Sequence, residues 1–443
     1  MEQHQRATLD KNTATPFLKS EKRFRRRMIL RAAYNIMGGL FALCLLPLLM
    51  LVAACARWYP KKVDVGLGPL PLINNVYHKQ ALTLYGYTSE TFVNGVYYIT
   101  DEFDVRGEQT IWGRGRIPRT LLLPPYLLVR ALYRYNCVYM YFNGGPLGNY
   151  PILWRVEPML YKLANVKVMV MAYGSDVQDL SRSPNLLFKD AMARDYPHHR
   201  LHRRRTAARI DLWTQWADHM IGGCEWVDYL YYWDTLMLAH FSIDVDRWHP
   251  LDQRSVHAPL VDQRPLRILH APNHRTIKGT QFFINAVNEL VAEGLNIELI
   301  ILERAPNSKV REIMASVDVV ADQLIIGWYA MFALEAMAME KPVLCYLRAD
   351  LEALYIAAGL VKVAEIPIIQ CSPLTVKERI RELALNRAVL DDIGKRSRAF
   401  VLKHHSTQAV GRVFDSINRS IGLQPSAPIN PFNMRSLHRD TAS

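Results

Sequence analysis

The stretch "GWYAMFALEAMAMEKPVLCYL", residues 327–347, decides the fold class, because it joins an apolar helix to a short buried strand. Apolar side chains recur at helical spacing, at Met331, Leu334, Met337 and Ala338. "PVLCYL" follows as an uncharged strand. The first acid of the helix is Glu335, and an unpaired buried carboxylate is unfavourable. We therefore expect Glu335 to have a partner: an arginine, a backbone amide or a ligand.

Outward from this stretch, β-rich runs alternate with longer helical patterns, which is typical of parallel α/β units. A first series includes strands at 137–142, at 166–173 and near Ile221. A second series opens with "LRILHA" at 266–271 and contains the stretch above. The alternation is interrupted between Ser242 and Pro265, so the sequence predicts two α/β domains.

Length and composition fit this division. A chain of 443 residues suits two domains and an appendage. We expect a basic tail over 1–35, a membrane segment over 36–56, a first domain over 63–250, a second over 251–423 and an irregular tail over 424–443.

Charge and cysteine usage exclude several classes. The net charge is +13, but no zinc-finger spacing, basic heptad or RNA-binding signature accompanies it, so we expect no nucleic-acid partner. The six cysteines are scattered and include no C-x-x-C, which argues against a zinc site or a disulfide framework.

The segment 36–56 has no charge and is long enough to cross a membrane. Seven Lys or Arg lie between Lys19 and Arg31, which places the N-terminus in the cytoplasm if the helix crosses. Pro47 also allows a segment that dips in and returns, or that lies in the interface. A cleaved signal ending at Cys55 and a buried core helix are further alternatives. We expect association with an inner or plasma membrane and a cytoplasmic catalytic body.

Two strand-to-helix loops could hold an anion. "HAPNHRTIKGT", residues 270–280, places Arg275 and Lys278 beside a helix N-terminus, where a diphosphate would be stabilised. The amides near Ala330 and Met331 could face the same ligand. The alternative for the two cations is an ordinary solvated loop.

Two segments earlier in the chain carry weaker signals. "FNGGPLGN", residues 142–149, places Gly144 and Gly145 where a ligand could approach the backbone closely, or where the chain only turns. "HHRLHRRR", residues 198–205, is a solvated face or a site for lipid headgroups or a lipid diphosphate.

Together these residues resemble the C-terminal domain of the retaining glycosyltransferases of family 4, whose motif is E-G-F-G-L-P-x-x-E-A-M-A-x-G-K-P-V. The matching residues here are "GWYAMFALEAMAMEKPV". "AYGSD", residues 172–176, looks like the family's H-G-S-D turn. The resemblance implies the GT-B fold: two Rossmann-like parallel α/β domains facing a cleft.

The resemblance also implies roles for particular residues. Glu335 would bind the ribose of a nucleotide-sugar donor, while Arg275 and Lys278, the catalytic pair, would neutralise its diphosphate with help from the amides of Ala330 and Met331. Since fixed cations stabilise the charge that develops on the leaving phosphate, no metal is then required. On the acceptor side the resemblance points to Tyr173 and Asp176, and the glycine loop described above adds Gly144 and Gly145.

Two departures from the family pattern matter. Gly327 stands where the family's sugar-binding glutamate lies, and that role would pass to Asp322 or be unnecessary. Tyr173 replaces a histidine of the N-domain turn.

The sequence thus predicts a membrane-associated retaining glycosyltransferase acting on a lipid-linked saccharide or surface glycan. An inactive GT-B-like subunit of a glycan-assembly complex is the main alternative, and a nucleotide-sugar epimerase is the third.

Overall fold

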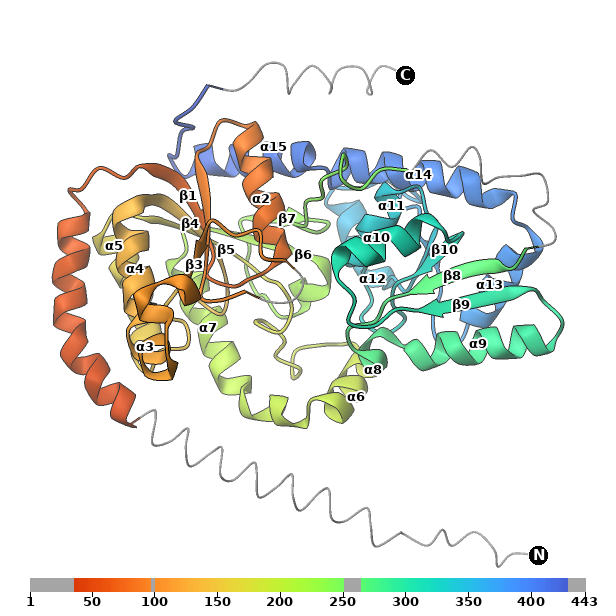
Figure 1. Ribbon diagram of the computed structural model, residues 1–443, viewed down its shortest axis with the longest axis horizontal. Helices are drawn as coiled ribbons and strands as arrows, with labels where there is room; N and C mark the ends of the chain where they lie inside the picture. The colour runs from red at the N-terminus through yellow and green to blue at the C-terminus, as the bar shows by residue number, and fades with distance from the viewer. Residues whose placement is uncertain (1–35, 97–99, 251–263, 429–443) are drawn as a thin grey trace, which may run out of the picture.

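The computed structural model describes residues 36–96, 100–250 and 264–428. The predicted basic tail, residues 429–443 of the predicted irregular tail, and the stretch 251–263 that follows the expected domain boundary lie outside the described residues. Over the described residues the chain forms two parallel α/β domains and an N-terminal apolar helix (Figure 1).

The first domain is built on a seven-stranded sheet in the order β3-β2-β1-β4-β5-β6-β7. Every pairing in this sheet is parallel, and Leu67 of β1 lies opposite Tyr139 of β4. Its strands are β1 (Val63–Leu67), β2 (Ser89–Val93), β3 (Val105–Arg106), β4 (Tyr135–Tyr141), β5 (Lys167–Met171), β6 (His219–Gly223) and β7 (Thr235–Met237). The central strands are buried along nearly their whole length, as their largely apolar sequences predict.

Helices cover both faces of this sheet. They are α2 (Ile73–Leu84), α3 (Arg116–Leu121), α4 (Leu123–Arg134), α5 (Glu157–Leu163), α6 (Leu186–Asp195) and α7 (Arg203–Trp216). The helical stretch that precedes β4 is divided at Leu122 into α3 and α4. Pro124 and Pro125 lie in the first turn of α4, where the missing amide hydrogens do no harm, and they start a new helix there.

The second domain has a five-stranded parallel sheet in the order β12-β11-β10-β8-β9. Its strands are β8 (Leu266–His270), β9 (Ile297–Ile301), β10 (Val319–Ala321), β11 (Val343–Cys345) and β12 (Ile369–Gln370). Its helices are α8 (Arg275–Lys278), α9 (Thr280–Ala292), α10 (Asn307–Ala315), α11 (Met331–Ala338), α12 (Ala349–Ala357), α13 (Val376–Leu385) and α14 (Val389–His404). The stretch that opened the sequence analysis forms α11 and β11.

The last helix, α15 (Thr407–Ser420), returns to the first domain and lies beside α2 (Figure 1). Asp415 accepts a hydrogen bond of 2.8 Å from the Tyr87 hydroxyl, and Asn418 accepts one of 2.7 Å from the Tyr139 hydroxyl. Phe414 joins the core cluster beneath the first sheet. The predicted second domain, 251–423, included this helix, because an amphipathic pattern shows that a helix buries one face but not which sheet receives it.

The N-terminal helix, Ile36–Ala56, runs unbroken through Pro47 and packs on the outer side of the first domain. Among the described residues it is the one helix long and apolar enough to cross a membrane.

Candidate functional site

The candidate site lies where the carboxyl ends of the strands of both sheets face each other. In open parallel sheets this is the edge where ligands bind. The domains touch there: the Asn185 amide donates to the carbonyl oxygens of Ile325 and Ile326 at 2.8 and 3.0 Å. The predicted donor residues come from the second domain, and the predicted acceptor residues come from the first.

The loop after β8 contains a short helix that the sequence did not predict. α8 carries both predicted cations, and Gly279, with φ of 73°, separates it from α9. The Arg275 guanidinium pairs with Glu303 at 2.8 and 3.0 Å, and both side chains are exposed. Arg275 is therefore held at the surface by an exchangeable ion pair.

Lys278 is more enclosed. Its ammonium lies 2.8 Å from Asp322 Oδ1 and 3.0 Å from Gln323 Oε1. Asp322 has a fully buried side chain, and its second oxygen accepts a hydrogen bond of 3.2 Å from the Ala330 amide, immediately before α11. Asp322 thus joins Lys278 to the Ala330 amide, and both of its carboxylate oxygens are engaged within the protein.

Glu335 lies on α11 with only 5% of its surface exposed. The Asn307 side-chain amide, at the start of α10, donates a hydrogen bond of 3.0 Å to its Oε1. Burial raises the pKa of Glu335 to about 7, and the positive charge of Arg247 opposes that rise. The expected partner exists, but it is a neutral side-chain amide rather than an arginine or a backbone amide.

The side chain of Arg348 packs against Gly327. Its φ is 98°, and a Cβ built there would lie 2.6 Å from Cδ and 2.7 Å from Cγ of Arg348. The Arg348 guanidinium bridges Asp228 of the first domain, at 2.5 and 3.1 Å, and Asp350. The position where the family has a glutamate is therefore filled by the stem of an arginine that links the two domains.

The acceptor-side residues of the first domain form one hydrogen-bonded unit. Asp176 Oδ1 accepts from the amides of Tyr173 and Gly174, and its Oδ2 accepts from the amide of Phe142, each at 3.0 Å. The loops after β4 and β5 are thereby tied together. Burial raises the pKa of Asp176 to about 7. The Tyr173 hydroxyl in turn accepts a hydrogen bond of 2.7 Å from the Asn143 side chain.

Glu157 packs beneath the glycine loop, residues 142–149, that follows β4. It is fully buried, and its Oε1 accepts a hydrogen bond of 3.0 Å from the Leu147 amide. A Cβ on Gly145 would lie 2.6 Å from that same oxygen and 2.5 Å from the Tyr161 hydroxyl. Burial raises the pKa of Glu157 to about 8. The glycine at 145 is thus required by close packing beneath the loop.

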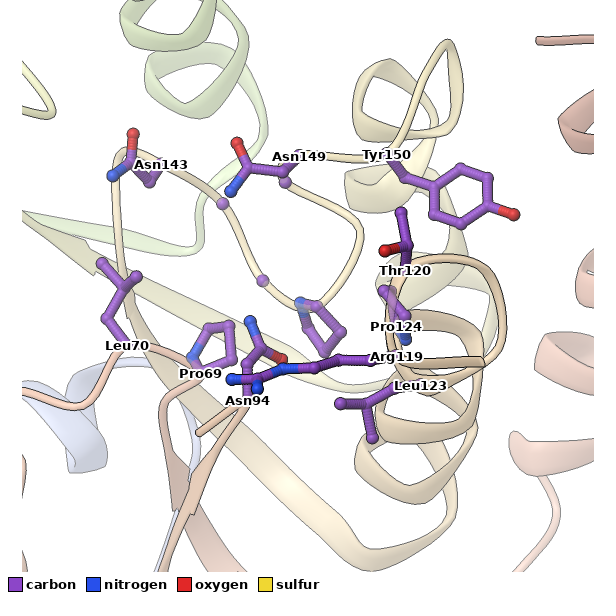
Figure 2. A pocket seen from close by; sticks show the side chains of 14 residues that line it. Pro69, Leu70, Asn94, Arg119, Thr120, Leu123, Pro124, Asn143, Asn149 and Tyr150 are labelled. Atoms are coloured by element: carbon purple, nitrogen blue, oxygen red, sulfur yellow. The ribbon is translucent and has the colours of Figure 1, made fainter. Parts of the chain in front are cut away.

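A cavity of about 190 Å³ opens on the other side of this loop (Figure 2). It lies between the ends of β1, β2 and β4 and the helices α3 and α4. Arg119 extends toward Asn94, while Asn143 and Asn149 lie on the far wall (Figure 2). The lining residues are Pro69, Leu70, Asn94, Arg119, Thr120, Leu123, Pro124, Asn143, Gly144, Gly145, Pro146, Gly148, Asn149 and Tyr150. The sequence indicated the two glycines but missed Arg119, which no local motif marks.

Glu225 was also missed. It follows β6 in the 3-10 helix Cys224–Asp228, is 8% exposed, and lies within electrostatic range of Lys278 and Arg348. Burial raises its pKa to about 8. An acid directly after a buried strand, in "HMIGGCE", was the available signal. Glu225 brings a first-domain carboxyl toward the cations of the second domain.

Comparisons with known proteins agree with this architecture. No family model matches the chain, and no curated protein sequence matches it. Sucrose-phosphate synthase from Thermosynechococcus elongatus has a similar structure, with a TM-score of 0.52, 12% identity, and coverage of 81% of this chain and 99% of that one.

Two further solved structures are similar at lower scores. WaaG, a glycosyltransferase involved in lipopolysaccharide biosynthesis, has a TM-score of 0.45, 13% identity, and coverage of 80% of this chain and 99% of that one. The pneumococcal O-GlcNAc transferase GtfA has a TM-score of 0.40, 10% identity, and coverage of 68% of this chain and 60% of that one. These three neighbours are GT-B glycosyltransferases, and a protein from Listeria monocytogenes described as a UDP-N-acetylglucosamine 2-epimerase is also similar, with a TM-score of 0.45 and 13% identity. The chain has the GT-B fold.

Proposed function

We propose that this protein is a membrane-associated retaining glycosyltransferase, resembling family 4, that moves a sugar from a nucleotide-sugar donor to a lipid-linked saccharide or surface-glycan acceptor. The observation that carries the proposal is that Lys278 and the buried Glu335 both lie at the carboxyl edge of the second sheet. These are the two positions at which the family motif holds a diphosphate and a ribose.

The donor chemistry follows from charge. When the bond between sugar and diphosphate breaks, negative charge grows on the phosphate oxygens, and a fixed cation stabilises that state more than the bound donor. Lys278 is positioned for this role by Asp322 and Gln323. Arg275 joins it by exchanging Glu303 for the diphosphate. Glu335, with its carboxyl buried beside α10, is suited to accept hydrogen bonds from vicinal hydroxyls.

The acceptor side is supported by the first-domain cavity. Arg119 offers a positive charge, and the side chains of Asn94, Asn143 and Asn149 offer donors and acceptors of the kind that sugar hydroxyls require. Asp176 and Tyr173 hold the adjoining loops in place. The N-terminal apolar helix supports membrane association, and therefore a lipid-linked acceptor.

A second candidate is a GT-B-like subunit without catalysis. Its support is Gly327: the sugar-binding glutamate of the family is absent, and the stem of Arg348 occupies its place. Asp322 does not supply the missing carboxylate in this conformation, because its side chain is fully buried and both oxygens are hydrogen-bonded.

Donor binding distinguishes the two candidates. The full chain in detergent is heated with uridine, guanosine, adenosine or cytidine diphosphate sugars, and the ligand-induced rise in melting temperature is recorded. One nucleotide class should stabilise the parent chain, and Lys278→Ala and Glu335→Gln should each abolish the rise. Lys309→Ala and Glu312→Gln, which remove an exposed ion pair on α10, are the matched controls and should keep it. No rise with any donor would favour the inactive subunit.

The stereochemistry needs a separate measurement. With the stabilising donor and a lipid-linked acceptor, the anomeric configuration of the product is read by nuclear magnetic resonance. Inversion at the anomeric carbon would refute the retaining mechanism while leaving the donor site in place.

A further inference from the structure

One face of the N-terminal helix is buried against the first domain. Along Ile36–Ala56 the most buried positions are one, three, four or seven residues apart, spacings that keep them on one side of a helix, so they form a single stripe. They are Gly38, Gly39, Ala42, Leu49, Ala53 and Ala56. Ala42, Leu49, Ala53 and Ala56 share a core cluster with Leu128 and Leu132 of α4 and Leu160 of α5. Small side chains along the stripe bring the helix backbone close to the domain.

This docking extends from one end of the helix to the other. At the start, a Cβ on Gly38 would lie 3.0 Å from the Pro151 side chain. At the end, the Lys61 ammonium joins the Ala56 carbonyl oxygen, at 3.3 Å, to the Ala164 carbonyl oxygen, at 2.9 Å. A helix of 21 residues is about 32 Å long at 1.5 Å per residue. The domain therefore lies beside the helix over a length equal to the hydrocarbon thickness of a bilayer.

The opposite face of the helix is exposed and apolar. The large side chains on it are Ile36, Met37, Leu40, Phe41, Leu43, Leu48, Met50 and Leu51, each 39–72% exposed. Trp58, 85% exposed, and Tyr59, 48% exposed, follow directly, and such aromatic residues favour the membrane–water interface. A continuous patch of this kind marks a surface that water does not normally cover.

A crossing orientation conflicts with the docked domain. If the helix spanned the bilayer while docked, the first domain, which lies beside it from Gly38 to Ala56, would have to enter the hydrocarbon with its charged surface groups. Each such charge is strongly unfavourable near the bilayer centre. If the helix left the domain to span alone, the core cluster around Leu128 and Leu160 would be opened to water.

We infer that this helix lies in the plane of the membrane, with its small-residue face on the first domain and its apolar face in the acyl region of a single leaflet of anionic phospholipids.

Charge at both ends supports an in-plane helix. The sequence before it has seven Lys or Arg between Lys19 and Arg31, and Arg57, Lys61 and Lys62 follow it. In a spanning helix these cations would face opposite leaflets, whereas in an in-plane helix all of them lie at the depth of one layer of headgroups. Anionic headgroups at that depth attract both ends.

The apolar surface continues onto the domain. Ile152, 38% exposed, lies against Gly39, and Tyr150 donates a hydrogen bond of 3.2 Å to the carbonyl oxygen of Leu121 at the end of α3. α3 also presents Ile117, 72% exposed, and carries Arg119 of the cavity. The leaflet surface thus reaches the helix that borders the candidate acceptor cavity. The inference rests on the membrane association proposed above but not on the sugar chemistry.

Topology is tested on the full chain in membrane vesicles, with Cys44→Ala and Cys55→Ala removing the exposed cysteines of the helix. Ala7→Cys and Ala442→Cys are then labelled, one at a time, with a maleimide that does not cross membranes. Both should react from the same side of the vesicle. Reaction from opposite sides would overturn the inference.

The labelling result alone does not show docking, because a hairpin in the membrane would also place both ends on one side. Docking is therefore tested by substituting two adjacent alanines. Ala53 is fully buried on the docking face, and Ala54 is exposed on the other. Ala53→Leu should lower the melting temperature by several degrees, whereas Ala54→Leu should leave it unchanged. Equal melting temperatures would show that the helix does not rest on the domain, and would overturn the inference whether or not donors bind.

The occupant of the outer face is tested with vesicles of phosphatidylglycerol and phosphatidylcholine. Leu40→Glu with Leu51→Glu should reduce sedimentation with these vesicles at least tenfold while nucleotide-sugar binding persists. If the double variant still sediments and instead converts a dimer to a monomer, the face belongs to a second copy of the chain and the inference fails.

Discussion

Replacing Glu335 by glutamine should make the protein more stable at alkaline pH, and by a pH-dependent amount. The carboxyl is almost fully buried, and burial raises its pKa from 4.5 to about 7. Glutamine keeps an oxygen that can accept the hydrogen bond from Asn307. The substitution therefore removes an ionisable group with little other change.

The sign follows from proton linkage. Between pH 4.5 and about 7 the folded protein keeps a proton on Glu335 that the unfolded chain has released, so stability falls as pH rises through this window. Below this window both the folded and the unfolded states keep the proton, so stability does not change. Above it both states have lost the proton, and the loss of stability reaches its full value. A rise from 4.5 to about 7, at about 1.4 kcal/mol per pKa unit, corresponds to about 3 kcal/mol at most.

The test is the difference in melting temperature between Glu335→Gln and the parent chain, measured in detergent from pH 4.5 to 8.5. The difference should be near zero at the acid end, grow up to about pH 7, and then stay constant. Asp176, Glu157 and Glu225 also have raised pKa values, but they are present in both chains and cancel in the difference. Glu312→Gln, at an exposed position, should give a flat difference. A flat profile for Glu335→Gln would refute the reasoning.

Three further substitutions probe the interface and its loops. Gly327→Ala should lower the free energy of unfolding by about 2–4 kcal/mol, because an added Cβ would strain the positive-φ backbone and clash with the Arg348 side chain. Gly359→Ala is the control: its φ is 72° but the space around it is open, so thermal unfolding should show a loss of only about 1 kcal/mol. Arg348→Met should destabilise by about 3–5 kcal/mol by leaving the buried Asp228 unpaired, and adding Asp228→Asn should recover part of that loss. Asp176→Asn should lower the melting temperature and reduce acceptor turnover more than donor binding, because the amide nitrogen that replaces one carboxylate oxygen cannot accept the backbone hydrogen bonds made to that oxygen. Equal losses in both would contradict its place on the acceptor side.

Periodicity and alternation in the sequence were enough to predict two parallel α/β domains, because strands buried on both faces need unbroken apolar runs. The same reasoning placed Lys278 and the Ala330 amide at one edge, since residues that follow neighbouring parallel strands meet there. These predictions depend on local sequence and on the regular geometry of a sheet.

Local sequence patterns could not predict the contacts between residues that are far apart in the chain. The Asn307 amide that meets Glu335 lies at the start of a different helix, and the Arg348 stem over Gly327 is fixed by an aspartate in the other domain. Arg119 lines the cavity from α3, while other lining residues follow β1, β2 and β4. In each case the decisive contact joins segments whose separation in the sequence says nothing about their distance in space.

The return of α15 to the first domain has a consequence for biosynthesis. The ribosome releases the seven strands of the first sheet long before Phe414 and Asn418, which complete the core and the hydrogen bonding beneath that sheet. The nascent first domain therefore exposes an uncovered apolar surface while the whole second domain is being translated. The first domain can complete its fold only after α15 has been synthesised, so the two domains cannot finish folding in the order in which they are made.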